Sequence, residues 1–214
     1  MSHTLIQDAL FTAKSSRELD RLAREQQGIA GTVLMKRAAR AALAELLDAF
    51  GTPSLLTVFC GSGNNGGDGY VLAALAAEKN ITVQCIELGA SLGEDATQAK
   101  QFAEQARVSF RQADSHFELD QGVIVDSLLG TGYEGELREP YVKAIALIND
   151  SGLPVLAMDI PSGLNCDTGA VASVAVKADM TLTFIAAKQG LFTGRGPSLC
   201  GEVIYDSLEV EEDI

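Results

Sequence analysis

Apolar and polar residues follow two different rhythms along this chain. Between residues 16 and 50, apolar residues recur every three to four positions, and a break at 28–31 separates two helical stretches. From residue 55 onward, short runs of apolar and β-branched residues alternate with stretches of helical spacing. The short runs predict strands at 55–60, 81–88, 108–110, 123–126, 155–159, 180–185 and 202–205, the last of them an edge strand. The stretches between them predict helices at 70–78, 95–106 and 141–149.

The predicted strands are apolar on both faces and are separated by helices. This combination is typical of an α/β fold, in which a parallel sheet is covered by helices on both sides. No internal period of roughly 20–50 residues indicates a repeat protein, and no proline- or serine-rich linker divides the chain. With 214 residues we therefore expect a single domain over 1–214, in which 208–214 form a solvated acidic tail.

Charge and composition exclude several kinds of partner. The chain has 16 Lys and Arg against 29 Asp and Glu, and its net charge of −13 argues against a nucleic-acid groove or an anionic membrane surface. No apolar run approaches the ~18 residues of a membrane span, and no signal peptide is evident at the N-terminus. The four cysteines form no C-x-x-C pair, as expected for reduced thiols in a soluble cytoplasmic protein.

A glycine-rich segment follows the first predicted strand directly. It reads Gly-Ser-Gly-Asn-Asn-Gly-Gly-Asp-Gly over residues 61–69, and its start matches the dinucleotide-binding pattern G-x-G-x-x-G. Glu87, at the end of the next strand, stands where an acidic ribose partner would. A turn that lets strand and helix pack explains the glycines equally well. The segment is distinguished by its polarity, because Asn64, Asn65 and Asp68 add side-chain donors and acceptors.

Polar residues also follow three later strands. Asp126 precedes Ser-Leu-Leu-Gly-Thr-Gly, Asp159 precedes Ile-Pro-Ser-Gly-Leu, and Lys188 follows the strand at 180–185. Each aspartate alone is explained by a capping role. Because the carboxyl ends of parallel strands meet at one edge of the sheet, the residues together predict a cleft with oxygen donors, a proton carrier and glycine loops.

The chemistry of this cleft is narrowed by elimination. The two histidines, at positions 3 and 116, are poorly placed for a Ser-His-Asp centre. The sequence also has no cluster of His and Cys residues that would bind zinc. The available oxygen ligands suit Mg²⁺, Ca²⁺ or an alkali ion. An aspartate and a lysine across a cleft can exchange protons, and the lysine equally suits phosphate binding. The residues alone leave acid–base chemistry and hydride transfer on a nucleotide-sized ligand open.

Taken in order, these motifs resemble one family, the NAD(P)H-hydrate epimerases, whose domain is the YjeF N-terminal domain. The likeness spans roughly residues 12–206. It is carried by the segments 16–39, 61–69, 126–132, 159–164, 167–169 and 188–191. The resemblance implies a Rossmann-like three-layer αβα sandwich with a mostly parallel sheet and N-terminal helices.

The same resemblance implies an activity and a set of site residues. Such enzymes interconvert the R and S forms of hydrated NADH and NADPH without a redox cofactor. Asp126 and Lys188 match the positions that act chemically, and Asn65, Asp126 and Ser162 match the ligands of a potassium ion. The residues that match substrate contacts are Asn64, Asn65, Gly66, Gly67, Asp68, Gly130, Thr131, Gly132, Tyr133, Glu134, Gly135, Glu136 and Asp159.

The resemblance also implies partners, namely a second copy of the chain in a homodimer and an NAD(P)H-hydrate dehydratase, separate or fused. Two other hypotheses stay open at this stage. An NAD-dependent oxidoreductase would rest on the glycine pattern and Glu87, but the sequence offers no convincing hydride-site histidine or Tyr-x-x-x-Lys motif. A non-catalytic nucleotide- or protein-binding module of the same fold would have a degraded cleft, whereas here every motif position is filled.

Overall fold

The fold is built around one parallel β-sheet. The structure is a computed structural model that describes residues 9–89, 91–113, 119–133 and 135–211. Within these residues seven strands pair in the order β3-β2-β1-β4-β5-β6-β7, and every pairing is parallel. The strands are β1 (Leu56–Cys60), β2 (Val83–Glu87), β3 (Ser109–Gln112), β4 (Val123–Ser127), β5 (Val155–Met158), β6 (Met180–Phe184) and β7 (Glu202–Asp206). The strand order therefore reverses between β1 and β4, and β7 is an edge strand as predicted.

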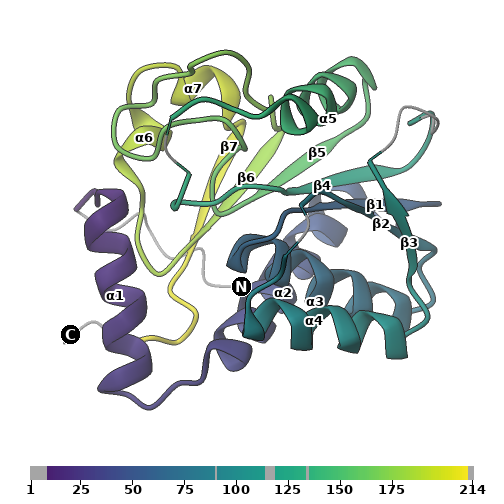
Figure 1. Ribbon diagram of the computed structural model, residues 1–214, viewed down its shortest axis with the longest axis horizontal. Helices are drawn as coiled ribbons and strands as arrows, with labels where there is room; N and C mark the ends of the chain where they lie inside the picture. Colours follow the sequence, from purple (N-terminus) through teal and green to yellow (C-terminus); the bar gives the residue numbers. More distant parts are fainter. Residues whose placement is uncertain (1–8, 90, 114–118, 134, 212–214) are drawn as a thin grey trace.

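Helices cover both faces of the sheet and make three layers (Figure 1). On one face lie α2 (Gly31–Phe50), α3 (Asn64–Glu78) and α4 (Glu94–Gln105). On the other face lie α5 (Glu139–Asp150) and two short helices, α6 (Gln189–Phe192) and α7 (Gly196–Leu199). The first helix, α1 (Ala13–Glu25, purple in Figure 1), lies beside this sandwich. The Rossmann-like α/β prediction is confirmed, and the sheet is parallel throughout.

The core explains why the central strands are apolar on both faces. All five residues of β1 are buried, and successive side chains point to opposite faces of the sheet. Val58 packs in the cluster under α2 and α3, with Leu46 and Leu72. Phe59 packs on the other face, in the cluster that includes Ile145 of α5. A strand that is buried on both faces has no room for polar alternation, which is the signal that the sequence carried.

The start of α3 corrects one prediction. The sequence predicted a helix from residue 70, but α3 begins at Asn64, so most of the glycine-rich segment is helical. Glycine costs about 1 kcal/mol relative to alanine in a helix, which is why the pattern indicated a loop. The close approach of the helix to its neighbours requires these glycines: a Cβ on Gly66 would lie 1.9 Å from the Gly61 carbonyl oxygen, and one on Gly69 would lie 2.7 Å from the Ser127 side chain. Packing therefore overrides helix propensity here.

The C-terminal segment corrects another. Residues 208–214 were expected to form a solvated tail, yet Leu208 and Val210 are buried against the core. Arg37 holds this segment by donating from Nη1 to the Leu208 carbonyl oxygen at 2.7 Å and pairing with Glu209 at 3.3 Å. Residues 212–214 lie outside the described residues.

The structure shows the state of the cysteines and the character of the helices. All four cysteines lie among the described residues, where they are buried and free. No helix in the described part of the chain is both long and apolar enough to cross a membrane. His3 and His116 lie outside the described residues.

Candidate active site

A cleft of about 430 Å³ opens at the carboxyl edge of the sheet. It lies beside the point where the strand order reverses, which is where open α/β sheets place their ligands. Its floor comes from the segments that follow β1, β4, β5 and β6, and its walls include α1 and the start of α2. The lining combines charged residues with an apolar patch made by Leu34, Met35 and Ala38 of α2.

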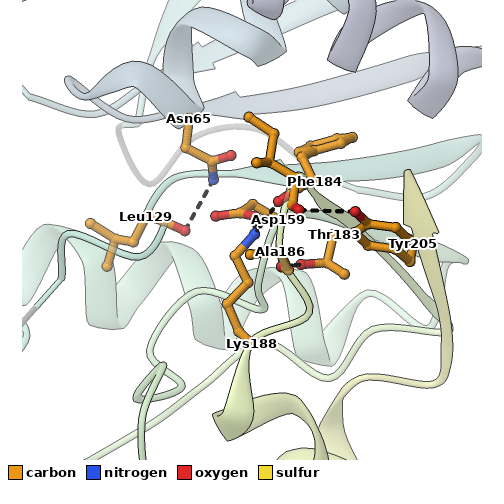
Figure 2. A network of polar contacts seen from close by, with 9 residues as sticks. Asn65, Leu129, Asp159, Thr183, Phe184, Ala186, Lys188 and Tyr205 are labelled. Carbon is orange, nitrogen blue, oxygen red and sulfur yellow. Dashed lines mark hydrogen bonds and ion pairs between the residues drawn. The ribbon is translucent and has the colours of Figure 1, made fainter. Parts of the chain in front are cut away.

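Lys188 and Asp159 form an ion pair at the floor of this cleft (Figure 2). The Lys188 side chain is only 2% exposed, and its ammonium donates both to the Asp159 carboxylate and to the Phe184 carbonyl oxygen, the latter at 2.7 Å. Asp159 adopts a left-handed backbone conformation, with a φ of 69°, directly after β5. An aspartate held in that conformation is a feature that structures commonly retain at functional sites. The pair is thus a buried charge couple that reaches the cleft.

The segment that carries Lys188 is braced from β7 and from β6. The Tyr205 hydroxyl donates to the Ile185 carbonyl oxygen at 2.9 Å. The Thr183 hydroxyl donates to the Ala186 carbonyl oxygen at 3.5 Å, a longer contact (Figure 2). These bonds satisfy backbone groups just beyond the last paired residue of β6, so Lys188 follows a braced turn.

Two more carboxylates face the ion pair from the helices. Asp68 in the first turns of α3 and Asp20 on α1 both line the cleft. Removal from water raises the pKa of Asp68 well above its usual range, and the negative charges of Asp159 and Asp20 raise it further. The pKa of Asp20 rises to about 6, first because the cleft shields its carboxyl in part from water, although the residue as a whole is exposed, and then because of the negative charge of Asp159. Three carboxylates thus lie near a single lysine, and the raised pKa values of Asp68 and Asp20 favour the protonated form of these two groups.

A second polar cluster lies directly behind the cleft. Asp126, at the end of β4, is completely buried and does not line the cavity. Its Oδ1 accepts hydrogen bonds from the Ser162 hydroxyl at 2.6 Å and from the Leu128 amide at 3.2 Å, and its Oδ2 accepts from the Ser162 amide at 2.7 Å. Burial raises the pKa of Asp126 to about 6, although the bonds from Ser162 oppose that rise.

Asn65 connects the second cluster to the cleft. Its Nδ2 donates to the Leu129 carbonyl oxygen at 3.0 Å, and the Leu129 amide donates to the Ser162 hydroxyl at 2.9 Å. The Asn65 Oδ1 is buried and has no hydrogen-bond partner in the described part of the chain. A buried polar atom without a partner calls for an explanation. One carboxylate together with neutral amide and hydroxyl oxygens is a donor set that fits a hard cation of low charge.

The structure sorts the sequence-predicted site residues into three groups. Those that line the cleft are Asn64, Asn65, Asp68, Gly130, Thr131, Gly132, Tyr133, Asp159 and Lys188. Those described but not among its lining residues are Gly66, Gly67, Asp126, Gly135, Glu136 and Ser162. Glu134 lies outside the described residues. Asp126 and Lys188, the predicted catalytic pair, are therefore separated: Lys188 reaches the cleft, and Asp126 lies behind it.

The wall formed by α1 was missed from the sequence. Arg17, Asp20 and Arg24 all line the cleft, at spacings of three and four residues along one helical face. The Arg17 guanidinium donates to the Thr131 carbonyl oxygen at 3.3 Å, and Arg24 pairs with Asp95 at 3.1 Å. The signal was present, because a charged stripe opposite an apolar face is visible in the sequence. It was overlooked since a solvated helix face has the same pattern.

Glu87 does not serve the role that the glycine pattern suggested for it. Its carboxylate is buried, accepts hydrogen bonds from the Tyr70 hydroxyl at 2.8 Å and from Gln112 at 3.1 Å, and pairs with Lys100 at 2.6 Å. These contacts tie β2 to α3, α4 and β3. Glu87 is thus engaged in packing between elements and is not among the residues that line the cleft.

The sequence matches a described family of proteins. A sequence model of the family described as YjeF-related protein N-terminus matches residues 31–190. The chain belongs to this family. The matched range includes the cleft segments that follow β1, β4, β5 and β6, whereas α1 precedes it and Leu208, after β7, follows it.

Individual relatives of this YjeF-related chain cover nearly its whole length. It is 44% identical over 205 residues to the bifunctional NAD(P)H-hydrate repair enzyme Nnr of Coxiella burnetii, a match of 95% of this chain and 42% of that protein. It is 36% identical over 197 residues to the NAD(P)H-hydrate epimerase of Limosilactobacillus fermentum, a match of 91% of this chain and 94% of that protein. The chain thus spans about two fifths of the bifunctional relative.

A solved structure supports the fold of this YjeF-related domain. The crystal structure of a yeast protein superposes with a TM-score of 0.76, covering 92% of this chain and 87% of that one, at 18% sequence identity. At that identity the likeness shows the fold alone.

Proposed function

We propose that this chain is an epimerase that interconverts the R and S forms of hydrated NADH and NADPH. Its membership in the YjeF-related family and its match to most of the Limosilactobacillus fermentum epimerase support this activity. The observation that carries the proposal is the Asp159–Lys188 ion pair, which joins an acidic and a basic side chain on the lining of a cleft of about 430 Å³. A cleft of this volume is within the range of small-molecule sites.

The chemistry requires no net redox change. The reacting carbon of the hydrate bears a hydroxyl group and the ring nitrogen. In one route an acid protonates the hydroxyl, water departs, the nitrogen lone pair forms an iminium, and water returns to the opposite face while a base takes its proton. In the other route a base takes the hydroxyl proton while an acid protonates the ring nitrogen, so that the carbon–nitrogen bond opens to an aldehyde and a neutral amine. The nitrogen then adds to the other face of the aldehyde, the oxygen takes a proton back, and the nitrogen loses its extra proton. Both routes need one group that donates a proton and one that accepts it.

The geometry favours Asp159 and Lys188 as the proton-exchanging residues. Both line the cleft, and their side chains form an ion pair there. Asp126, which the family resemblance placed in the chemical step, is completely buried and accepts three hydrogen bonds from Ser162 and Leu128. We propose that Asp126 acts from behind the cleft by fixing these segments and by contributing a negative charge to a cation site.

Asn65, Asp126 and Ser162 would hold that cation, for which potassium is the proposed ion. The partnerless Oδ1 of Asn65 and the single carboxylate of Asp126 support this choice, because a divalent ion favours more negative ligands. When bound, the ion would supply a fixed positive charge near the phosphate-bearing substrate. It would also offset part of the carboxylate charge in a protein whose net charge is −13.

A coupled assay tests the proposed function. An S-specific dehydratase is mixed with both hydrates, and consumption of the R form is followed with and without this chain. The proposal expects the R form to be consumed only when both proteins are present. If the R form persists, the non-catalytic binding module is favoured. If the chain instead transfers hydride with intact NAD, the oxidoreductase is favoured.

An NAD(P)H-hydrate dehydratase is the functional partner that we propose for this chain. We also propose that the chain forms a homodimer and that it lies in the cytoplasm.

A further inference from the structure

The N-terminal arm, residues 10–12, runs alongside the segment that carries Lys188. Phe11 forms an isolated parallel bridge with Lys188. The Phe11 amide donates to the Ala187 carbonyl oxygen at 2.8 Å, and the Gln189 amide donates to the Phe11 carbonyl oxygen at 2.9 Å. Lys188 lies beyond the end of β6, where sheet pairing no longer holds the backbone. The arm therefore supplies the strand-like pairing that the sheet does not.

A single carboxylate from elsewhere in the chain anchors this arm. Oδ1 of Asp167 accepts a hydrogen bond from the amide of Ala13, the first residue of α1, at 2.6 Å. The first amides of a helix have no partner inside it and favour a negative charge nearby. α1, all of whose residues are described, has no acidic residue in its first turn. Asp167 supplies that charge from 154 residues further along the chain.

The turn that bears Asp167 also contacts the lysine segment, at Gly190, two residues beyond Lys188. The Asn165 side-chain oxygen accepts hydrogen bonds from the amides of Asp167 at 3.1 Å and Thr168 at 2.9 Å, which fixes the turn. The carbonyl oxygen of Cys166 accepts from the Gly190 amide at 2.6 Å. A side chain on Gly190 would collide with this turn, since its Cβ would lie 2.1 Å from the Asn165 carbonyl oxygen. The turn at 165–169 thus holds the arm through Asp167 and the lysine segment through Cys166.

We propose that Asp167 is a positioning residue for Lys188, which it acts on by anchoring Phe11 and the start of α1. This inference rests on the proposed function, in which the Lys188 ammonium exchanges protons with the substrate. Without the Asp167 bond, the arm is released from the turn and the backbone pairing on either side of Lys188 weakens. The ammonium then loses its fixed distance from Asp159.

Three variants of the full chain separate positioning from general stability. Asp167→Ala removes the acceptor, and Asp167→Asn keeps an oxygen at the same place. Asp179→Ala is the matched control, because the exposed Asp179 likewise accepts a backbone amide, that of Val155 at 2.9 Å, at the start of β5 and away from the cleft lining. Each variant is measured for epimerisation kcat and KM, for Tm, and for amide hydrogen exchange at Phe11 and Gln189.

For Asp167→Ala we expect kcat to fall at least about tenfold, since small displacements of a catalytic group reduce rates by such factors. KM should change less than about threefold, and exchange at Phe11 and Gln189 should accelerate at least about tenfold. Asp167→Asn should recover kcat to within about threefold of wild type. Asp179→Ala should lower Tm about as much as Asp167→Ala does, but it should leave kcat and the exchange rates of the Phe11 and Gln189 amides unchanged.

Two results would overturn the positioning role. One is unchanged exchange at Phe11 and Gln189 in Asp167→Ala, whatever the activity. The other is a kcat in Asp167→Ala no lower than that of Asp179→Ala. A wild-type chain without epimerase activity would instead overturn the proposed function, and the exchange measurement would still decide whether Asp167 anchors the lysine segment.

Discussion

Neutralising the two charges of the Asp159–Lys188 pair, singly and together, distinguishes a catalytic from a structural role. Lys188→Met keeps most of the length of the side chain and removes its charge together with its hydrogen-bond donors. Lys188 is 2% exposed and Asp159 16%, so the single variant leaves a largely buried carboxylate beside Asp68 and Asp20. Breaking one side of a buried pair costs about 3–5 kcal/mol. Because Asp159 retains some exposure and can take up a proton, we expect about 3 kcal/mol, or a Tm lower by about 6–12 °C.

The double variant Lys188→Met/Asp159→Asn should regain most of this stability, since no unpaired charge is then left by the pair. The expected coupling energy is about 2 kcal/mol, within the range for groups in contact. Activity should behave in the opposite way. Each single variant should lower kcat by at least about 10², and the double variant should recover none of it, because a proton-exchanging group is lost in both.

The assays are thermal or urea unfolding for stability and the dehydratase-coupled consumption of the R hydrate for kcat. The reasoning is refuted if the double variant turns over within tenfold of wild type. It is also refuted if Lys188→Met alone retains wild-type kcat, since the lysine would then be structural. Additive stability losses in the two single variants would show that the pair is not coupled.

Three further predictions follow from other parts of the structure. Potassium at about ten times its Kd should stabilise the wild type by about 1.4 kcal/mol, which corresponds to a rise in Tm of about 3–6 °C. Asn65→Ala should abolish this rise. Thermal unfolding in potassium and in tetramethylammonium salts measures both effects. Asp20→Asn should raise Tm at pH 8 by about 2–4 °C, a size that is reduced to allow for the exposure of the side chain, and should leave Tm unchanged at pH 4. The reason is the raised pKa of about 6 in the folded state: the stability that protonated Asp20 contributes is fully present below about pH 4 and is lost as the pH rises through 6. Gly66→Ala should destabilise by at least about 2 kcal/mol in urea, since its Cβ would lie 1.9 Å from the Gly61 carbonyl oxygen, whereas Gly63→Ala, with no described atom within 4 Å of its Cβ, should be tolerated.

Each of these has an outcome that would contradict it. An equal potassium effect in wild type and Asn65→Ala would place the ion elsewhere. A rise in Tm for Asp20→Asn that is the same at pH 4 and pH 8 would separate it from the titration of Asp20. Equal stability of Gly66→Ala and Gly63→Ala would mean that the close contact of α3 with β1 is not what requires glycine.

The sequence predicted best where one physical cause dominates. Runs such as Val123-Ile124-Val125 are buried on both faces of the sheet, and only a strand in the centre of a parallel sheet tolerates that pattern. Once the strands were parallel, Asp159 and Lys188 had to lie at the same edge. Their pairing, however, depends on the left-handed turn at Asp159 and on the bracing of the lysine segment, which no spacing rule contains.

The sequence predicted least where distant segments decide the outcome. The glycines of α3 disfavour a helix by propensity, and only the contact with Gly61 and Ser127 makes them necessary. The first residue of α1, which forms one wall of the cleft, is bonded to Asp167, which lies 154 residues away in the chain. Likewise, the burial of Asp126 behind the cleft follows from Ser162, which comes from the segment after β5.

The central claim is that this chain epimerises the hydroxyl-bearing carbon by proton exchange at the Asp159–Lys188 pair. The most direct measurement starts from stereochemically pure S hydrate, with no dehydratase present, and follows the appearance of the R form by chiral chromatography. The account predicts that the R form appears at a rate proportional to the concentration of the wild-type chain and close to the spontaneous rate with Lys188→Met. Appearance of the R form at the spontaneous rate with the wild-type chain, or equally fast with both proteins, would contradict it.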